Sequence, residues 1–191
     1  MGWVFAVLLA VMVRAEEVWV LLPEAKFMGH KVTRPVAEAK ATVLAVARMT
    51  ELGPEFPSQQ EWNAVPMTEA ELLAATRKKA GEWMAAVKPE LVRDKKKVLR
   101  YAVLRSGAVP VSATVLAREF FEKFEPMFGA RMRVVIPNRN TVFIFPDLAG
   151  DLREYGPMVM EAWRSGAPKV SLEVLEVRAD GLRAVGAFEE P

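Results

Sequence analysis

The chain has 191 residues, of which 52% are apolar and 26% charged, a composition typical of a globular protein that buries a core of its own. Lysine and arginine (26) nearly balance aspartate and glutamate (24), so the net charge of +2 gives no global reason to expect a nucleic acid or a membrane surface as partner. The absence of cysteine excludes disulfides, thiolate metal sites and cysteine nucleophiles.

The first predicted element is an export signal. An apolar run at residues 3–13 leads into Val13-Arg14-Ala15, which suits cleavage after Ala15. The run is shorter than the roughly 20 residues that a membrane-spanning helix needs. No lysine or arginine precedes it, which departs from the usual signal layout. We therefore expect a signal peptide at residues 1–15 and a periplasmic or secreted protein; the alternative is a buried first helix or strand of a cytosolic protein.

The next segments predict a β-rich portion at residues 16–50. Short apolar or alternating runs at residues 18–22, 26–36 and 41–48 are separated by polar links, which favours a small antiparallel sheet. Residues 51–66 contain four glycines or prolines and several polar residues, which predicts a loop or linker. The remainder, residues 67–191, forms an α+β portion that is either a separate domain or one domain with residues 16–50.

A helix is predicted to begin after Thr68, because Thr68 and Glu71 have the spacing of a capping box. Apolar residues then recur at helical steps and predict one buried face, and Pro89 ends the pattern. The predicted buried face consists of Leu72, Leu73, Thr76, Ala80, Trp83, Met84 and Val87.

The rest of the chain alternates predicted strands and helices. Strands are expected at residues 98–104, 132–136 and 141–145, and a hairpin at 170–177 and 182–188 around Asp180-Gly181. Helices are expected at residues 117–128, with Phe120, Phe121, Phe124 and Phe128 inward, and at 148–163, where Pro157 is a kink or a fresh start. The predicted fold class is α+β, with antiparallel sheets and packed helices after a signal-like segment.

The polar link between the strands at 132–136 and 141–145 is the first candidate contact site. Pro137 suits a strand end, and Asn138 and Asn140 tolerate left-handed backbone angles, so a turn explains these three residues. Arg139 is left over, and at an exposed loop tip its planar fork could clamp a carboxylate or phosphate. The alternative is a solvated arginine, for which Arg139→Ala changes stability by no more than about 0.5 kcal/mol.

A basic run at residues 77–105 is the second candidate contact site. Ten basic residues stand there against three acidic ones, a local charge of +7 that suits phosphates, nucleic acid, anionic lipid or an acidic protein. An extracytoplasmic location argues against nucleic acid. Lysines in a loop or on the polar side of a helix are also ordinary solvated residues. The candidate contact residues of this run are Lys95, Lys96, Lys97 and Arg100.

No pattern in the sequence assigns a catalytic residue, a metal ligand or a cofactor site. His30 is the only histidine, and the chain contains neither a Gly-x-Ser-x-Gly elbow nor a glycine-rich phosphate loop. Asp147 and Asp151 lie four residues apart at the start of a predicted helix, where carboxylates favour the helix dipole. Dispersed carboxylates are the catalytic alternative that a sequence does not exclude.

Residues 101–146, which include PNRNT at 137–141, and the following Asp-Gly hairpin resemble a family of uncharacterised bacterial proteins. In that family a helix leads into a hairpin with a Pro-Asn-Arg-Asp-Thr-like turn. Asn140 stands where that pattern has aspartate, so any role of the aspartate does not carry over. The resemblance covers the C-terminal half and implies a fold rather than an activity.

The sequence as a whole favours an exported, non-catalytic binding or interaction module. Its partner is unknown, with a protein or a small anionic ligand as the classes that the candidate residues suit. The alternatives are a hydrolase that uses dispersed carboxylates and a cytosolic anion-binding regulator.

Overall fold

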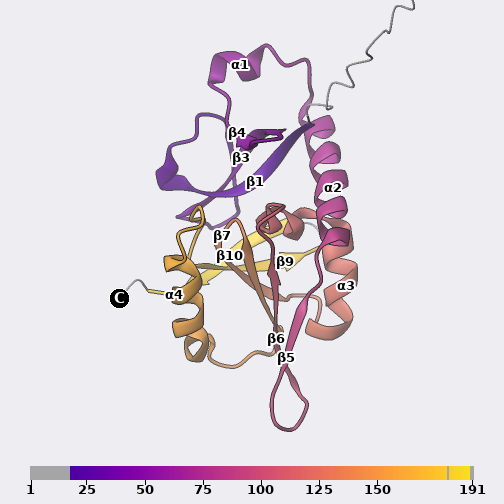
Figure 1. Cartoon of the computed structure of the whole chain (residues 1–191), viewed down its shortest axis with the longest axis vertical. Helices are drawn as coiled ribbons and strands as arrows, with labels where there is room; N and C mark the ends of the chain where they lie inside the picture. The colour runs from indigo at the N-terminus through magenta and orange to yellow at the C-terminus, as the bar shows by residue number, and fades with distance from the viewer. Residues whose placement is uncertain (1–17, 180, 190–191) are drawn as a thin grey trace, which may run out of the picture.

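The structure is a computed structural model that describes residues 18–179 and 181–189 (Figure 1). The predicted signal peptide at 1–15 and Asp180 of the predicted turn lie outside the described residues. Two antiparallel sheets with packed helices confirm the predicted α+β class. The smaller sheet lies at one end of the molecule, and the larger sheet with most of the helices makes up the rest (Figure 1).

The smaller sheet contains four strands in the N-terminal part of the chain. Strands β1 (Val18–Ala25), β3 (Thr42–Thr50) and β2 (Thr33–Pro35) pair in that order, and β4 (Gly53–Glu55) also pairs with β3. The predicted small antiparallel sheet is therefore confirmed. The strand expected at 26–36 is mostly wrong, because a short 3₁₀ helix, η1 (Lys26–Met28), and a loop precede β2.

The prediction of a loop at residues 51–66 is also only partly correct. It contains β4 and a short helix, α1 (Gln59–Asn63). Helix α1 begins with a capping box in which Ser58 accepts from the Glu61 amide and the Glu61 carboxylate accepts from the Ser58 amide. The Ser58–Glu61 spacing is the sequence signal for this helix start, which the prediction of a loop missed.

Helix α2 (Glu69–Ala86) joins the two sheets. Its start is as predicted, since Thr68 accepts from the Glu71 amide and Glu71 accepts from the Thr68 amide. The N-terminal half packs on the smaller sheet through buried Leu72, and the Thr76 hydroxyl accepts from the Leu21 amide at 2.9 Å. The C-terminal half contributes Ala80 and Met84 to the core of the larger sheet. Leu73, predicted to be buried, is 36% exposed.

The larger sheet has six strands in the order β10-β9-β7-β8-β6-β5, all paired antiparallel. The expected strands correspond to β6 (Leu99–Arg105), β7 (Arg133–Asn138), β8 (Thr141–Phe145), β9 (Glu173–Arg178) and β10 (Gly181–Ala187). Edge strand β5 (Glu90–Arg93) was not predicted. Its side chains are mostly exposed, so it shows no apolar alternation.

The two faces of the larger sheet are covered by different helices. Val134 and Ile144 face a core with α3 (Arg118–Phe128) and η2 (Val111–Leu116), whereas Val135 and Phe143 face a core with α4 (Gly156–Arg164). Because both faces are covered, β7 and β8 read as continuous apolar runs.

The helices on these two faces refine the sequence predictions. Phe120, Phe124 and Phe128 of α3 are buried as predicted, whereas Phe121 is half-buried. Pro157 marks a fresh start, because α4 begins beside it after the short 3₁₀ helix η3 (Leu152–Tyr155). Within the described part of the chain, no helix is both long enough and apolar enough to cross a membrane.

Candidate functional site

The predicted loop-tip arginine is held inside the molecule. Arg139 lies in the link between β7 and β8, and its side chain is 15% exposed. Its guanidinium donates through Nε and Nη2 to both carboxylate oxygens of Glu24 on β1, with an Nη2–Oε2 distance of 3.1 Å. Glu24 is fully buried. The expectation of an exposed arginine is therefore wrong, because the smaller sheet supplies a buried anion for it.

Two aromatic rings complete this buried ion pair. The guanidinium carbon of Arg139 lies 5.1 Å from the centroid of the Phe56 ring, and His30 stacks on the same ring at a centroid distance of 3.8 Å. The Nε2 atom of His30 is buried and lies 3.6 Å from Glu24, beyond hydrogen-bond reach. Burial of the imidazole lowers the pKa of His30. The negative charge of Glu24 opposes this shift, and the positive charge of Arg139 adds to it. His30 is thus a neutral packing residue at neutral pH.

The flanking asparagines are structural as well. Asn138 is buried, and its side-chain amide nitrogen, Nδ2, donates to the backbone carbonyl of Ala162 at 2.6 Å, which joins the turn to the end of α4. Its side-chain oxygen, Oδ1, accepts from the backbone amide of Asn140 at 2.9 Å. Neither asparagine has a positive φ, so the tolerance of asparagine for left-handed angles is not used here; the Asn138 side chain stabilises the predicted turn by its hydrogen bond to Asn140. Pro137 is the next-to-last residue of β7, at the register shift between Val135 and Asn138, so it lies close to the strand end as expected.

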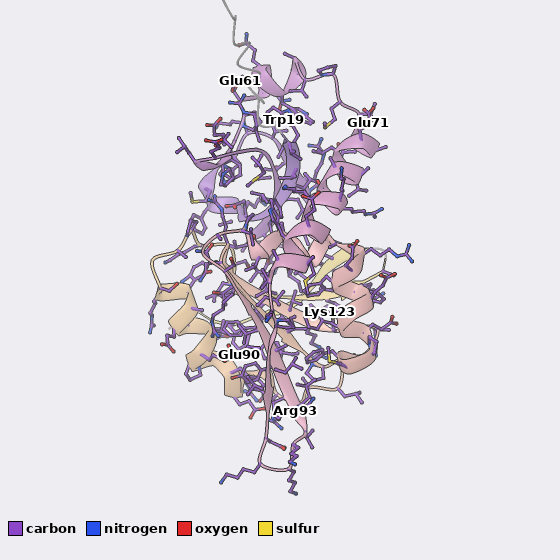
Figure 2. The ribbon with its side chains drawn as sticks, turned by 45° about the vertical axis from the view of Figure 1, so that its right-hand side comes forward. Trp19, Glu61, Glu71, Glu90, Arg93 and Lys123 are labelled. Carbon is purple, nitrogen blue, oxygen red and sulfur yellow. The ribbon has the colours of Figure 1, made fainter. Side chains whose placement is uncertain are left out.

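The other predicted contact residues lie at the opposite end of the molecule from the smaller sheet. Strands β5 and β6 form a hairpin that projects beyond the body, and Figure 2 labels Arg93 at the base of its loop. Lys95, Lys96 and Lys97 occupy this loop, as predicted, and all three are exposed. Among the described residues, no carboxylate lies within ion-pair distance of these three ammonium groups.

Asp94 shapes the hairpin loop rather than neutralising it. Its carboxylate accepts from the amides of Lys96 and Val98 at 2.8 and 2.9 Å, and its backbone pairs with Lys97 and Val98. Lys97 has a φ of 63°, an uncommon value for a residue with a side chain. The Asp94 turn therefore holds three consecutive lysines outward on a fixed backbone.

Arg100 is brought only partly into this surface. It lies on β6 and donates to Glu154 at 2.6 Å, with its guanidinium carbon 6.0 Å from the Tyr155 ring. It lines a shallow hollow of about 260 Å³ together with Val98 and Leu148, which are 56% and 92% exposed. The lysine loop thus continues into an exposed aliphatic strip formed by Val98 and Leu148, and the neighbouring Arg100 is already paired with Glu154.

A second hollow, of about 340 Å³, lies in the smaller sheet and was not predicted. Trp19, Arg48, Glu55, Phe56 and Glu61 are among its lining residues, and Figure 2 shows Trp19 and Glu61 at the end opposite the hairpin. Both carboxylates are already engaged. Glu55 pairs with Arg48 at 2.6 Å, and the Ser58 amide and hydroxyl lower the pKa of Glu61 in the capping box. The two carboxylates of the hollow therefore serve an ion pair and a helix cap.

The other candidate groups for chemistry are separately engaged. Asp147 lies 3.4 Å from Arg131, and Asp151 accepts from the Arg153 amide and guanidinium. These contacts with Arg153 lower the pKa of Asp151. Within residues 18–179 and 181–189, no group of three or more histidine, aspartate or glutamate side chains could hold a metal ion.

The chain matches no protein-family model, no curated protein and no solved structure.

Proposed function

We propose that this protein is an exported, non-catalytic binding module that contacts an anionic partner through the loop of the β5–β6 hairpin. The observation that carries the proposal is the projecting lysine triplet, Lys95, Lys96 and Lys97, in which none of the three is paired with a carboxylate in the described part of the chain. With Arg93 and Asp94, the loop has four cationic side chains against one carboxylate, a net charge of +3.

The other candidate contact residues already have partners within the protein, which supports the choice of the hairpin loop. Asn138 and Arg139 are used to hold the turn and the buried Glu24, so their polar groups are directed into the molecule. Arg100 has Glu154 as partner. The carboxylates that line the larger hollow, Glu55 and Glu61, are likewise engaged, which favours binding over hydrolysis.

The proposal is tested by retention of the chain from residue 16 onward on phosphocellulose. Replacing the triplet (Lys95→Gln, Lys96→Gln and Lys97→Asn) removes three charges, and asparagine at 97 accepts the positive φ. The matched control removes three exposed charges elsewhere, at Lys78, Lys88 and Lys123, each changed to Gln. We expect the triplet variant to elute at clearly lower salt than the control variant, since clustered charges release more counterions. Equal elution of the two variants would overturn the proposal.

A further inference from the structure

We infer that the anionic partner of the hairpin is the surface of a phospholipid bilayer, which the lysines contact while the neighbouring Val98 and Leu148 enter its headgroup region. The inference rests on the proposed function above, because it uses the same three lysines. It adds the exposed aliphatic strip beside them, which a purely ionic contact leaves unused.

The aliphatic strip is the first step of the argument. Val98 directly follows the lysine triplet, and both Val98 and Leu148 line the shallow hollow between the hairpin and the segment after β8. Leu148 is 92% exposed and Val98 56%, although the core buries most other large apolar residues of the larger sheet. Two exposed aliphatic groups beside a basic loop match the headgroup region of a membrane, where apolar groups descend and lysine ammonium groups remain at the phosphates.

The surrounding charges leave this end cationic. Glu154 is held by Arg100 and Asp151 by Arg153. Glu90, on β5, is held by Arg105 at 2.7 Å. Asp94 is folded into its own turn. The lysine triplet therefore faces outward, with no carboxylate of residues 18–179 or 181–189 in contact, and the projection of the hairpin lets it reach a flat surface before the described remainder of the molecule does (Figure 1).

Other anionic partners fit this end less well. Single-stranded nucleic acid is bound through stacking on exposed aromatic rings, but Tyr101 and Tyr155 are half-buried and pack on Phe145. A hollow of about 260 Å³ does not enclose a helix of an acidic protein. A bilayer requires neither a groove nor stacking.

The expected affinity is modest and salt-sensitive. Each lysine at an anionic membrane surface strengthens partitioning by about fivefold, so the triplet contributes about a hundredfold. At about 0.5 M salt the Debye length falls to about 4 Å, and most of this gain is lost.

The test is sedimentation of the chain from residue 16 onward with vesicles of phosphatidylcholine alone or with about 30% phosphatidylglycerol. We expect binding to the anionic vesicles only, reduced about a hundredfold by the triplet variant and unchanged by the Lys78, Lys88 and Lys123 control. Val98→Ser with Leu148→Ser should weaken binding about fivefold or more through the lost apolar contact. The matched control replaces an exposed leucine and valine elsewhere, Leu52→Ser with Val185→Ser, and should bind as the unchanged protein does.

The outcomes separate this inference from the proposed function. If phosphocellulose retention depends on the triplet but anionic vesicles do not bind, or bind equally well without Val98 and Leu148, the bilayer inference is overturned and the proposed function stands. If neither the resin nor the vesicles distinguish the triplet from its control, both are overturned. All variants alter exposed side chains, so their circular dichroism should match that of the unchanged protein.

Discussion

At the residue scale, Arg139 shows how a surface prediction changes when a buried partner is found. The sequence indicated a turn arginine whose removal costs almost nothing. The structure places its guanidinium against Glu24, 115 residues away along the chain and fully buried. No local pattern relates two residues so far apart, so the pair could not be predicted from the sequence. The turn itself was predicted, because proline and asparagine act on their own neighbours.

Arg139→Ala is therefore expected to lower the free energy of unfolding by about 3 kcal/mol, since it leaves the Glu24 carboxylate buried without its cation. Arg139→Lys should recover only part of this loss, because an ammonium group lacks the planar fork that meets both carboxylate oxygens. Urea denaturation followed by fluorescence measures the change. The control is Arg118→Ala, which breaks the exposed pair with Glu122 and should cost less than about 1 kcal/mol. Equal losses for Arg139→Ala and Arg118→Ala would show that Glu24 does not depend on its partner.

At the element scale, short sequence motifs predicted the helices and turns that depend on neighbouring residues. They did not predict the elements that depend on packing against distant parts of the chain. The Thr68–Glu71 capping box located the start of α2, and the four phenylalanines located α3. The pairing of strand β5 and the packing of α2 on both sheets depend on neighbours from distant parts of the chain, which periodicity does not report. The lysine loop was placed correctly before a strand, but the β5 strand that makes it a projecting hairpin was missed.

The two capping boxes give a prediction at this scale. Thr68→Ala should destabilise the protein by about 1 kcal/mol, because α2 packs on both sheets and cannot unwind without loss of the core. Ser58→Ala removes the same interaction from α1, which has no buried residue, so α1 can fray locally and global stability should change by less than about 0.5 kcal/mol. Urea denaturation measures both. A Ser58→Ala effect as large as that of Thr68→Ala would contradict the assignment of α1 as a peripheral helix.

At the scale of the whole molecule, two carboxylates connect the smaller sheet to the larger one. Glu24 of β1 binds Arg139 between β7 and β8. Glu173 of β9 accepts from three consecutive amides, of Lys40, Ala41 and Thr42, at 2.6, 3.1 and 2.9 Å, and from the Thr42 hydroxyl at 2.6 Å. A backbone hydrogen bond from Ala184 to Ala37 adds a third connection. Each carboxylate accepts hydrogen bonds from the part of the chain on the other side, so these two side chains help to hold the smaller sheet against the larger one.

Glu173 makes this dependence measurable as a function of pH. Burial raises the pKa of Glu173, but hydrogen bonds from Thr42, Lys40 and Ala41 outweigh it, so the pKa lies below the ordinary value of 4.5. A carboxyl group with a lowered pKa stabilises the fold above its unfolded-state pKa, and that stabilisation is lost as the pH falls through its folded-state pKa. Glu173→Gln should therefore cost about 2 kcal/mol at neutral pH, and its stability should approach that of the unchanged protein as the pH falls below 4.5.

Urea denaturation at a series of pH values, followed by tryptophan fluorescence, measures this convergence. The control is Glu82→Gln, because Glu82 is exposed and pairs only with Lys79 one turn away, so its effect should stay small at every pH. A Glu173→Gln deficit of the same size at pH values above and below 4.5 would mean that the charge of Glu173 does not hold residues 40–42. Convergence would show that one ionised side chain of the larger sheet fixes the loop that leads into β3 of the smaller sheet, because the neutral form forfeits the charge-assisted part of those hydrogen bonds.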